Sequence, residues 1–201
     1  CKKKIVLSDK DYETIEVAKN FNDLEILYQK KPGVGSAIIE GIESSKTKYF
    51  CILMADGSTD PKYLNQMLNL MKQNDKSIVF GSRYEGTGKS LDDNLITRIG
   101  NFFFSAVGNI FFKLNISDIL FTYFVAKKED IDKMELFSDN YNLCVEIPIK
   151  AKLMNIAYMT LPCIERKRVA DKKKVKTFKV GFEILFFLFK CYTNSNFINQ
   201  K

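Results

Sequence analysis

The chain has 201 residues, of which 46% are hydrophobic and 27% are charged, and its formal net charge is +7. This balance is typical of a globular protein, and the length suits one domain with a full core rather than two. The absence of histidine excludes histidine-based catalytic triads, histidine metal sites and imidazole bases. The five cysteines are scattered without a C-x-x-C pair, which favours reduced thiols over a disulfide framework or a zinc site.

The first part of the chain alternates short apolar runs with helical patterns. Strands are expected at residues 4–7, 24–28, 49–54 and 77–80. Helices are expected around 15–21, after a glycine turn at 31–37 as far as about 42, and at 61–71. Strands that alternate with helices predict right-handed βαβ units, and therefore an α/β fold with a mainly parallel central sheet flanked by helices.

Beyond residue 83 the pattern changes. We expect a loop at 85–88, a long phenylalanine-rich helix at about 93–112, a strand at 120–125, a short helix from 128, a helix at 141–152 and a strand at 157–162. A basic block at 166–176 and an apolar segment at 178–189 follow. The chain is therefore expected to form one main domain over residues 1–177, with an amphipathic segment over 178–201.

The apolar run at 49–54 ends abruptly at a turn that contains Asp56, Ser58 and Asp60. Ligands of open α/β sheets bind at the carboxyl ends of strands, so Asp56 would lie at the mouth of a crevice, where a carboxylate can hold a divalent cation. The alternative is that Asp60 caps the helix beginning at Pro61 and that Asp56 only shapes the turn. The residues themselves leave both interpretations open.

Several ordered motifs resemble those of one enzyme family. They are the glycine segment at 33–41, the Asp56 motif, Gly81-Ser-Arg83-Tyr84, Arg98 with Asn101, Asp118, Glu146-Ile-Pro148 and the basic stretch 165–178. With these pieces in this order, nearly the whole chain resembles the inverting family 2 glycosyltransferases, and most of all the dolichol- or polyprenyl-phosphate sugar transferases. The resemblance implies a Rossmann-like GT-A fold and the inverting transfer of a sugar from a nucleotide-sugar donor to a polyprenyl phosphate.

The chain departs from the family pattern in several places. The family's first strand, with its P-x-Y-N-E turn, has no counterpart, and the chain opens at Cys1 rather than methionine, so it is expected to lack its natural start. The turn after the first strand is reduced to residues 8–12, where Asp9 remains. Met54 occupies the first position of the D-x-D metal motif, and residues 120–123 replace a T-S-G-F segment. A degenerate, non-catalytic member is one alternative.

The resemblance assigns donor and metal roles. Asp56 with Ser58 would hold Mg²⁺ or Mn²⁺, and the cation would neutralise the charge that develops on the departing diphosphate, which makes Asp56 a catalytic residue. The residues expected to contact the nucleotide-sugar are Asp9, Gly33, Gly35, Asp56 and Glu146. For Glu146, an ion pair with Lys150 one helical turn away is the alternative.

An acceptor phosphate is already largely anionic near neutral pH, so it needs cations that orient it more than it needs a general base. The candidates for this clamp are Arg83, Arg98, Asn101, Arg166, Arg168 and Lys174, the last three on a loop that could close over both substrates. Surface ion pairs and a solvated basic face are the alternatives for these side chains.

Asp118 distinguishes two kinds of acceptor. It is a candidate catalytic base or sugar-orienting residue, and a plain acid at a helix end is the alternative. A family 2 enzyme that glycosylates a saccharide, as in cell-surface polysaccharide synthesis, would need Asp118 as the base because its acceptor is a neutral hydroxyl.

Residues 178–189 carry one strongly apolar helical face, formed by Phe182, Leu185, Phe186 and Phe189, with lysines near both ends. Such a helix can lie in the interface of an anionic membrane or pack into a core. We favour the interface, and hence a peripheral location at the cytoplasmic face of the cell membrane, where a membrane-embedded partner would also be accessible. Nucleic acid is not an expected partner, because the basic run has neither interleaved aromatic residues nor a recognition-helix motif.

Overall fold

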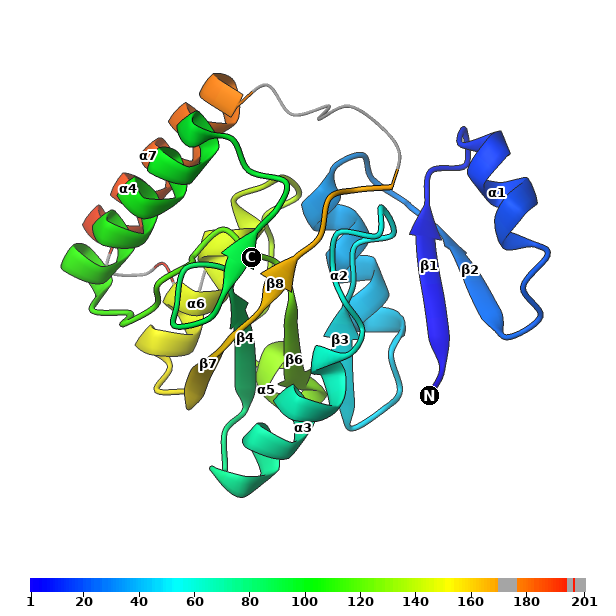
Figure 1. The fold of residues 1–201 in the computed structure, drawn as a ribbon, viewed down its shortest axis with the longest axis horizontal. Helices are drawn as coiled ribbons and strands as arrows, with labels where there is room; N and C mark the ends of the chain where they lie inside the picture. The colour runs from blue at the N-terminus through cyan, green and yellow to red at the C-terminus, as the bar shows by residue number, and fades with distance from the viewer. Residues whose placement is uncertain (170–176, 195–196, 198–201) are drawn as a thin grey trace.

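A computed structural model describes residues 1–169, 177–194 and 197 (Figure 1). In chain order the elements are β1 (Lys3–Leu7), α1 (Tyr12–Ala18), β2 (Leu24–Tyr28), α2 (Val34–Ser44), β3 (Tyr49–Ile52), α3 (Tyr63–Gln73), β4 (Ile78–Ser82), β5 (Lys89–Ser90), α4 (Leu95–Phe112), β6 (Phe124–Lys127), α5 (Lys128–Asp132), α6 (Leu143–Leu153), β7 (Tyr158–Pro162), β8 (Ile164–Glu165) and α7 (Thr177–Thr193). The α/β fold class is confirmed.

A four-stranded sheet with the order β3-β6-β4-β7 forms the centre of the molecule. β4 and β7 are parallel, whereas β6 runs antiparallel to both of its neighbours, β3 and β4. A second, parallel sheet of β1 and β2 lies beside it with α1, on the right in Figure 1. A two-stranded sheet is marginal alone, and α2 links this unit to the main body, since Gly41 of α2 faces Val6 of β1.

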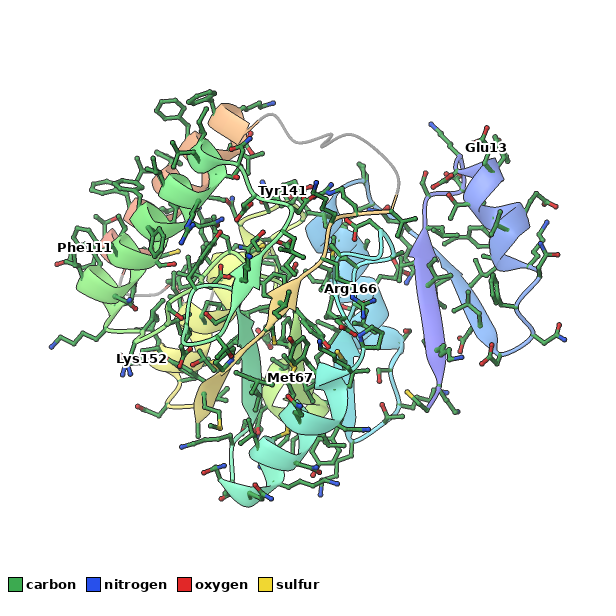
Figure 2. All side chains as sticks on the ribbon, in the orientation of Figure 1. Glu13, Met67, Phe111, Tyr141, Lys152 and Arg166 are labelled. Atoms are coloured by element: carbon green, nitrogen blue, oxygen red, sulfur yellow. The ribbon has the colours of Figure 1, made fainter. Side chains whose placement is uncertain are left out.

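Alternating side chains of the central strands divide the core into two layers. On β4, Ile78 and Phe80 belong to one hydrophobic cluster and Val79 to the other, as the period of two in a strand requires. The Val79 side is covered by α3, where Met67 (labelled in Figure 2) is fully buried. The opposite side is covered by α6 together with the inner faces of α2, α4 and α7.

The helix α4 begins at a capping box. The side chain of Asn94 accepts from the N–H of Thr97 at 2.9 Å, and the Thr97 hydroxyl accepts from the N–H of Asn94 at 3.0 Å. Its buried stripe is Asn101, Ser105, Gly108 and Phe112, spaced at three and four residues so that one face packs inward. Among the described residues, α4 is long and apolar enough to cross a membrane by length and composition only.

The helices α4 and α7 lie side by side (Figure 1), and each is apolar on both faces. On α7, Ile184, Leu188 and Cys191 are buried in the core, whereas Phe182 and Phe186 on the other face are 73% and 71% exposed. On α4, Ile99, Phe102, Phe103, Ile110 and Phe111 are exposed in the same way; Phe111 projects from the outer edge in Figure 2. The face predicted from the sequence on residues 182–189 is therefore the solvent-facing one, and α4 extends it.

Strand β6 begins at Phe124, later than the strand expected at 120–125. Residues up to Tyr123 instead form a loop, in which the Tyr123 hydroxyl donates to the carbonyl of Asp60 at 2.7 Å. This loop carries Asp118 to the carboxyl end of β4. Because β6 starts at Phe124, the residues before it are free to form the loop that places Asp118 beside Arg83.

Candidate functional site

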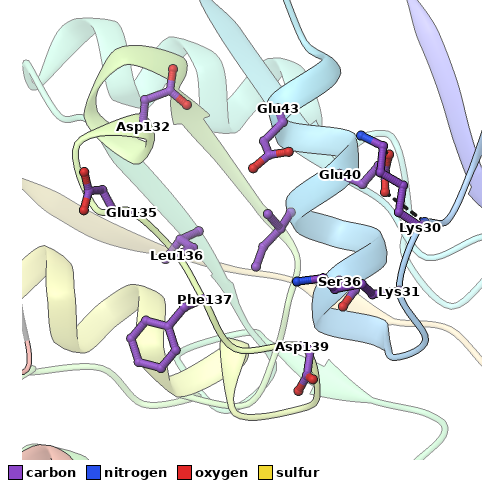
Figure 3. Close-up of a pocket in the computed structure, with 11 residues that line it drawn as sticks. Lys30, Lys31, Ser36, Glu40, Glu43, Asp132, Glu135, Leu136, Phe137 and Asp139 are labelled. Carbon is purple, nitrogen blue, oxygen red and sulfur yellow. Dashed lines mark hydrogen bonds and ion pairs between the residues drawn. The ribbon is translucent and has the colours of Figure 1, made fainter. Parts of the chain in front are cut away.

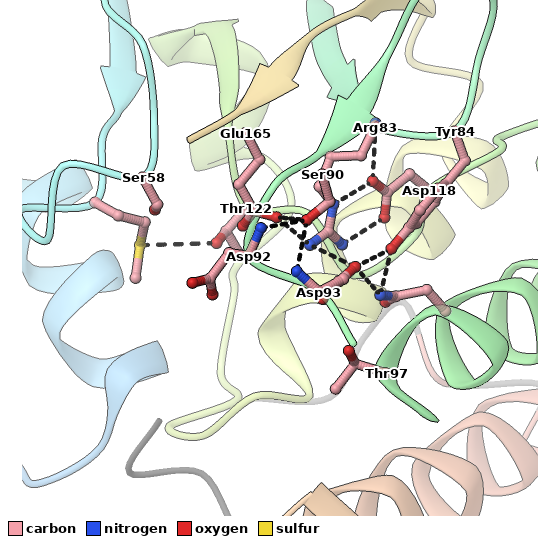
Figure 4. Close-up of polar contacts among 12 residues, drawn as sticks. Ser58, Arg83, Tyr84, Ser90, Asp92, Asp93, Thr97, Asp118, Thr122 and Glu165 are labelled. Atoms are coloured by element: carbon pink, nitrogen blue, oxygen red, sulfur yellow. Dashed lines mark hydrogen bonds and ion pairs between the residues drawn. The ribbon is translucent and has the colours of Figure 1, made fainter. Parts of the chain in front are cut away.

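The carboxyl end of β4 delivers Arg83 into a buried cluster of carboxylates (Figure 4). Its guanidinium donates to both oxygens of Asp118, with Nε–Oδ2 and Nη2–Oδ1 distances of 2.7 and 2.9 Å. Its Nη1 donates to Oε2 of Glu165 at 3.2 Å and lies 3.7 Å from Oδ2 of Asp93. None of the four side chains is more than 9% exposed. Two residues that were predicted separately, Arg83 and Asp118, are therefore brought together as a bidentate ion pair.

The charge of Arg83 is fixed by these neighbours. Burial alone lowers the pKa of the guanidinium, but the Coulombic attraction of Asp118 and Glu165 outweighs burial and raises the pKa above its ordinary value. A buried charge is tolerated only when it is paired in this way. Because both oxygens of Asp118 are engaged by Arg83, the geometry makes Asp118 the residue that orients Arg83 rather than a free base.

A second layer of hydrogen bonds ties the cluster to α4. The Tyr84 hydroxyl donates to Asp93, and the amide of Asn101 donates to the Tyr84 oxygen at 2.9 Å and to Oδ2 of Asp93 at 3.2 Å. From the other side, the Ser90 hydroxyl donates to Glu165. Asn101, which was predicted together with Arg98, is thus linked to Arg83 through Asp93.

The turn after β3 is covered by residues 166–169, which we call the cover segment. The backbone N–H of Arg166 donates to the carbonyl of Ser58 at 2.8 Å, and that of Val169 donates to the carbonyl of Asp56 at 3.0 Å. Nη2 of Arg166 lies 2.5 Å from Oδ2 of Asp60. Nε of Arg168 lies 3.9 Å from Oδ2 of Asp56, so each carboxylate of the turn faces an arginine.

The carboxylates also shape the turn itself. The N–H of Ser58 donates to Oδ1 of Asp56 at 2.9 Å, and the N–H of Lys62 donates to Oδ1 of Asp60 at 3.1 Å. Asp56 therefore shapes the turn, as the alternative expected, whereas α3 begins only at Tyr63 with Lys62 as its N-cap residue, and Asp60 holds the turn before the helix rather than capping it. Asp60 is buried, but the side chain of Asp56 remains 25% exposed and its Oδ2 faces Arg168.

Two carboxylates, Asp56 and Asp92, lie on either side of the Arg168 guanidinium. Nε of Arg168 lies near two carboxylates, Asp56 at 3.9 Å and Asp92 at 3.1 Å, so a positive charge already sits between them. Within the described residues there is no group of three or more His, Cys, Asp or Glu arranged for a metal. The protein would therefore supply Asp56, with Asp92 and Ser58 nearby, and a bound diphosphate would supply the remaining oxygens.

A cavity of about 230 Å³ opens beside the Arg83 cluster. Its polar wall is Arg83, Asp93, Asn101 and Arg168, and the rest is formed mainly by apolar residues of α4 and α7. The predicted phosphate residues Arg83, Asn101 and Arg168 thus share one cavity.

Glu146 requires a correction. Its side chain is fully buried, and its oxygens accept from the backbone N–H groups of Phe137 at 3.1 Å and Ser138 at 2.9 Å. It also forms an ion pair of 3.1 Å with Lys150, the alternative that its spacing allowed. Both oxygens of Glu146 are therefore engaged within the protein, where they hold the 137–138 loop, and the predicted contact with the nucleotide-sugar is not supported.

The predicted donor glycines also serve packing. A Cβ at Gly33 would lie 2.0 Å from the carbonyl oxygen of Asp139, and one at Gly35 would lie 2.2 Å from that of Ser138. Gly33 in addition has φ +118°, which disfavours other residues. These glycines let α2 approach the 138–140 loop, and Asp9 lies exposed in the turn after β1.

The remaining predicted cations are placed differently from Arg83. Arg98 is exposed on α4, where its guanidinium lies 5.9 Å from the centre of the Phe102 ring, and it does not line the 230 Å³ cavity. Helical geometry explains this, because Thr97 and Asn101 share the face towards the cavity and Arg98 lies off that face. Lys174 falls outside the described residues.

A larger pocket of about 700 Å³ lies between α2 and residues 132–139 (Figure 3). Its wall combines lysines and carboxylates, among them Lys30 in an ion pair of 3.1 Å with Glu40. It contains none of the predicted site residues. Its size alone therefore gives no reason to prefer it as the functional site.

Asp92, Asp93 and Glu165 were not predicted, although they hold the arginines of the site. Tyr84 stood inside the G-S-R-Y motif without a role. The sequence did contain a hint of the role of Asp93, because this residue directly precedes Asn94, the N-cap of the helix that carries Asn101. Glu165 gave a weaker signal, because it stands only at the border of the basic block.

These motifs can be compared with known proteins. A sequence model described as Glycosyl transferase family 2 matches residues 2–134. The chain belongs to this family. A dolichol-phosphate mannosyltransferase of Pyrococcus furiosus is 27% identical over 150 residues, which are 74% of this chain and 42% of that protein. The chain therefore spans less than half the length of this mannosyltransferase.

Solved structures show the same fold. Glucosyl-3-phosphoglycerate synthase from Mycobacterium tuberculosis, in complex with Mn²⁺, UDP-glucose and glycerol 3-phosphate, has a TM-score of 0.66 at 12% identity and covers 95% of this chain and 69% of its own. The same synthase with phosphoglyceric acid has a TM-score of 0.68 at 11% identity and covers 96% and 70%. At these identities the likeness establishes the GT-A fold of this family 2 member.

Proposed function

We propose that this family 2 glycosyltransferase transfers a sugar, with inversion, from a nucleotide-sugar to a polyprenyl phosphate. The observation that carries the proposal is the pair of cavities between α4 and α7. The 230 Å³ cavity with Arg83, Asn101 and Arg168 lies against the first turns of both helices, and an apolar groove of about 580 Å³ follows further along them, lined by Val107, Phe111 and α7 residues up to Tyr192. A phosphate head with an isoprenoid tail matches this order of polar and apolar walls.

The chemistry needs charge more than it needs a base. An acceptor phosphate oxygen would attack the anomeric carbon from the face opposite the diphosphate, while the bond between that carbon and the diphosphate oxygen breaks and the nucleoside diphosphate leaves. The acceptor is already anionic, so no proton must be removed. Arg168 and Asn101 would orient the phosphate, and Asp118 would hold Arg83 in place beside it.

Mg²⁺ or Mn²⁺ would be held by Asp56, with Ser58 beside it, and would supply Lewis-acid neutralisation of the departing diphosphate. Structures of the M. tuberculosis synthase contain UDP with Mn²⁺ or with Mg²⁺, which supports a metal-bound nucleotide for the present chain. Asp56, whose side chain is 25% exposed, would be the main protein ligand, with Asp92 on the other side of Arg168.

The outer face of α4 and α7 would rest on an anionic membrane at the cytoplasmic side. Phe178, Phe182, Phe186 and Phe189 of α7 are 65–74% exposed and continue the exposed apolar residues of α4. Such a face is costly in water and favourable at a lipid interface, where Lys179 and Lys190 can meet acidic headgroups. The apolar groove would then open towards the lipid that carries the acceptor.

The activity is tested with the full chain, vesicles that contain polyprenyl phosphate, Mn²⁺ and a panel of labelled nucleotide-sugars. We expect label to move into the lipid fraction, and Asp56→Asn to lower that rate at least about 100-fold. Asp75→Asn, a change of the same kind at a side chain that is 97% exposed, serves as control. Label that appears on an added oligosaccharide instead of the lipid would contradict the polyprenyl-phosphate acceptor.

Membrane attachment is tested by vesicle flotation. The double change Phe182→Ser and Phe186→Ser should reduce binding to vesicles that contain acidic lipid, with little loss of stability because both rings are exposed. Tyr12→Ser on α1, a ring that is 72% exposed on another part of the molecule, is the matched control. Equal flotation of all three proteins would count against the proposed surface.

A further inference from the structure

The arginines of the cover segment pair with the carboxylates that a cation bound to the nucleotide-sugar would need. Nε of Arg168 lies 3.9 Å from Oδ2 of Asp56 and 3.1 Å from Oδ2 of Asp92, and Arg166 pairs with Asp60. The backbones are joined as well, by hydrogen bonds from Arg166 to Ser58 and from Val169 to Asp56. The segment is therefore fixed to the turn at both ends, with its positive charges on the turn's negative ones.

The contact between the two segments is also close sterically. A Cβ at Gly57 would lie 2.8 Å from Cγ2 of Val169, and Gly57 has φ +80°. Glycine at this position therefore allows the cover segment to lie directly on the turn. The Val169 side chain thus packs directly on the backbone of Gly57, and a diphosphate that approaches the turn from this side must first displace it.

We infer that Arg168 is the resident counter-cation of Asp56, and that the cover segment is a latch which a divalent cation must displace before the donor is bound. The inference rests on the proposed function, since it takes Asp56 as the ligand of the cation. Arg168 and a divalent cation would repel each other at the Oδ2 edge of Asp56, so metal binding at Asp56 and the Arg168 contact compete. Once displaced, the guanidinium of Arg168 is free for the phosphate cavity that it already lines.

Arg168 and Lys167 provide a matched pair for the experiment. Each change, Arg168→Gln or Lys167→Gln, removes one positive charge from the same segment, but only Arg168 contacts Asp56; Lys167 is exposed. Manganese binding to the full chain without nucleotide is measured from the free Mn²⁺ signal in electron paramagnetic resonance. We expect Arg168→Gln to bind Mn²⁺ about tenfold more tightly than the wild type and Lys167→Gln to stay within about twofold.

A second readout does not involve metal. Hydrogen exchange at the amide of Val169, which donates to the Asp56 carbonyl, should be faster in Arg168→Gln than in the wild type. Arg168→Lys, which keeps the charge, should give an Mn²⁺ affinity between those of the wild type and Arg168→Gln.

The outcomes separate the latch from the proposed function. If Asp56→Asn loses Mn²⁺ but Arg168→Gln binds it no more tightly than the wild type, the latch is wrong and the metal site stands. If neither the wild type nor Arg168→Gln binds Mn²⁺, with or without UDP, the metal site and the latch both fail. Metal-free UDP binding that disappears in Arg168→Gln would make Arg168 a direct ligand of the diphosphate and would likewise overturn the latch.

Discussion

Arg83 places one positive charge among three buried carboxylates, Asp118, Glu165 and Asp93. It is also flanked by the rings of Phe121 and Tyr84, whose centres lie 4.6 and 5.3 Å from its guanidinium carbon. Such a residue connects the β4 end, the Asp118 loop and β8. Its primary contribution is therefore to assemble the site, and any contact with substrate depends on that assembly.

Arg83→Met should destabilise the protein by about 3–5 kcal/mol, because it leaves buried carboxylates without their counter-charge. Urea denaturation followed by circular dichroism measures the change. Arg98→Met, at an exposed position on α4, is the control and should stay within about 0.5 kcal/mol. Similar midpoints for the two variants would show that the Arg83 cluster does not stabilise the fold.

The cysteines should differ sharply in reactivity. Cys1 is exposed, whereas burial raises the pKa of Cys163 and of Cys191 to about 12. Since the thiolate is the reactive form, we expect one fast thiol in the native protein at pH 8, and the others only after unfolding. Titration with a chromogenic disulfide measures this, and Cys1→Ser should remove the fast phase. A fast phase that survives Cys1→Ser would contradict the assigned burial.

Sequence reasoning identified Arg83 and Asp118 as site residues but did not pair them. Asp118 lies 35 positions from Arg83 and Glu165 lies 82 positions away, and no local pattern encodes a contact over such distances. By contrast, the pairing of Glu146 with Lys150 was visible as an alternative, because spacing of four on a helix places the two side chains on one face. Contacts within one helix could thus be predicted from the sequence, whereas contacts between residues far apart in the chain could not.

The helices α4 and α7 show why the period of a helix is informative but incomplete. A helix with apolar residues on all sides can be a core helix or can have one face outside the protein. The sequence of α7 predicted the apolar face at residues 182–189 but left its direction open between core and interface. The structure shows a core stripe through Ile184 and Leu188 and an exposed stripe through Phe182 and Phe186 on the same helix.

Two helical glycines should respond oppositely to alanine. At Gly35 a Cβ would lie 2.2 Å from the Ser138 carbonyl oxygen, so Gly35→Ala should cost about 1–3 kcal/mol. At Gly100 no atom of the described residues lies within 4 Å of the added Cβ, and Gly100→Ala should stabilise by about 0.5–1 kcal/mol through helix propensity. Thermal unfolding of both variants checks the signs. A stabilising Gly35→Ala would refute the close approach of α2 to the 138–140 loop.

Most helices and strands were predicted within a few residues, because apolar periodicity and glycine turns are local. The reversal of β6 was not predictable in the same way, since strand direction depends on the connections around it and not on its own side chains. The late start of β6 has a similar cause: residues 120–123 are as apolar as a strand, yet the Tyr123 hydroxyl is held by the Asp60 carbonyl.

The whole fold should respond to acid partly through Asp60. Burial alone raises the pKa of this carboxyl, but the N–H of Lys62 and the side chains of Arg166 and Lys62 outweigh burial and hold the pKa below its ordinary value of 3.8. A group with a lowered pKa in the folded state stabilises the fold above its unfolded pKa and loses that effect as the pH falls through the folded value. The stability difference between wild type and Asp60→Asn should therefore be largest near pH 6 and shrink below about pH 4.

Chemical denaturation at several pH values measures this difference, with Asp75→Asn at an exposed site as the control for removing one negative charge. A constant gap between wild type and Asp60→Asn from pH 6 to pH 3 would show that the Asp60 carboxylate is not linked to folding.

Strand β6 stands between β3 and β4, although it follows both of them in the chain. While the polypeptide emerges from the ribosome, β3 and β4 are complete but have no partner between them until residues 124–127 appear. Nascent chains shorter than this expose two apolar strand edges, which is the condition under which chaperones bind and intermolecular pairing begins. Translation pauses that occur before residues 124–127 have left the ribosome should accordingly lower the soluble yield, and pauses that occur after these residues have emerged should not.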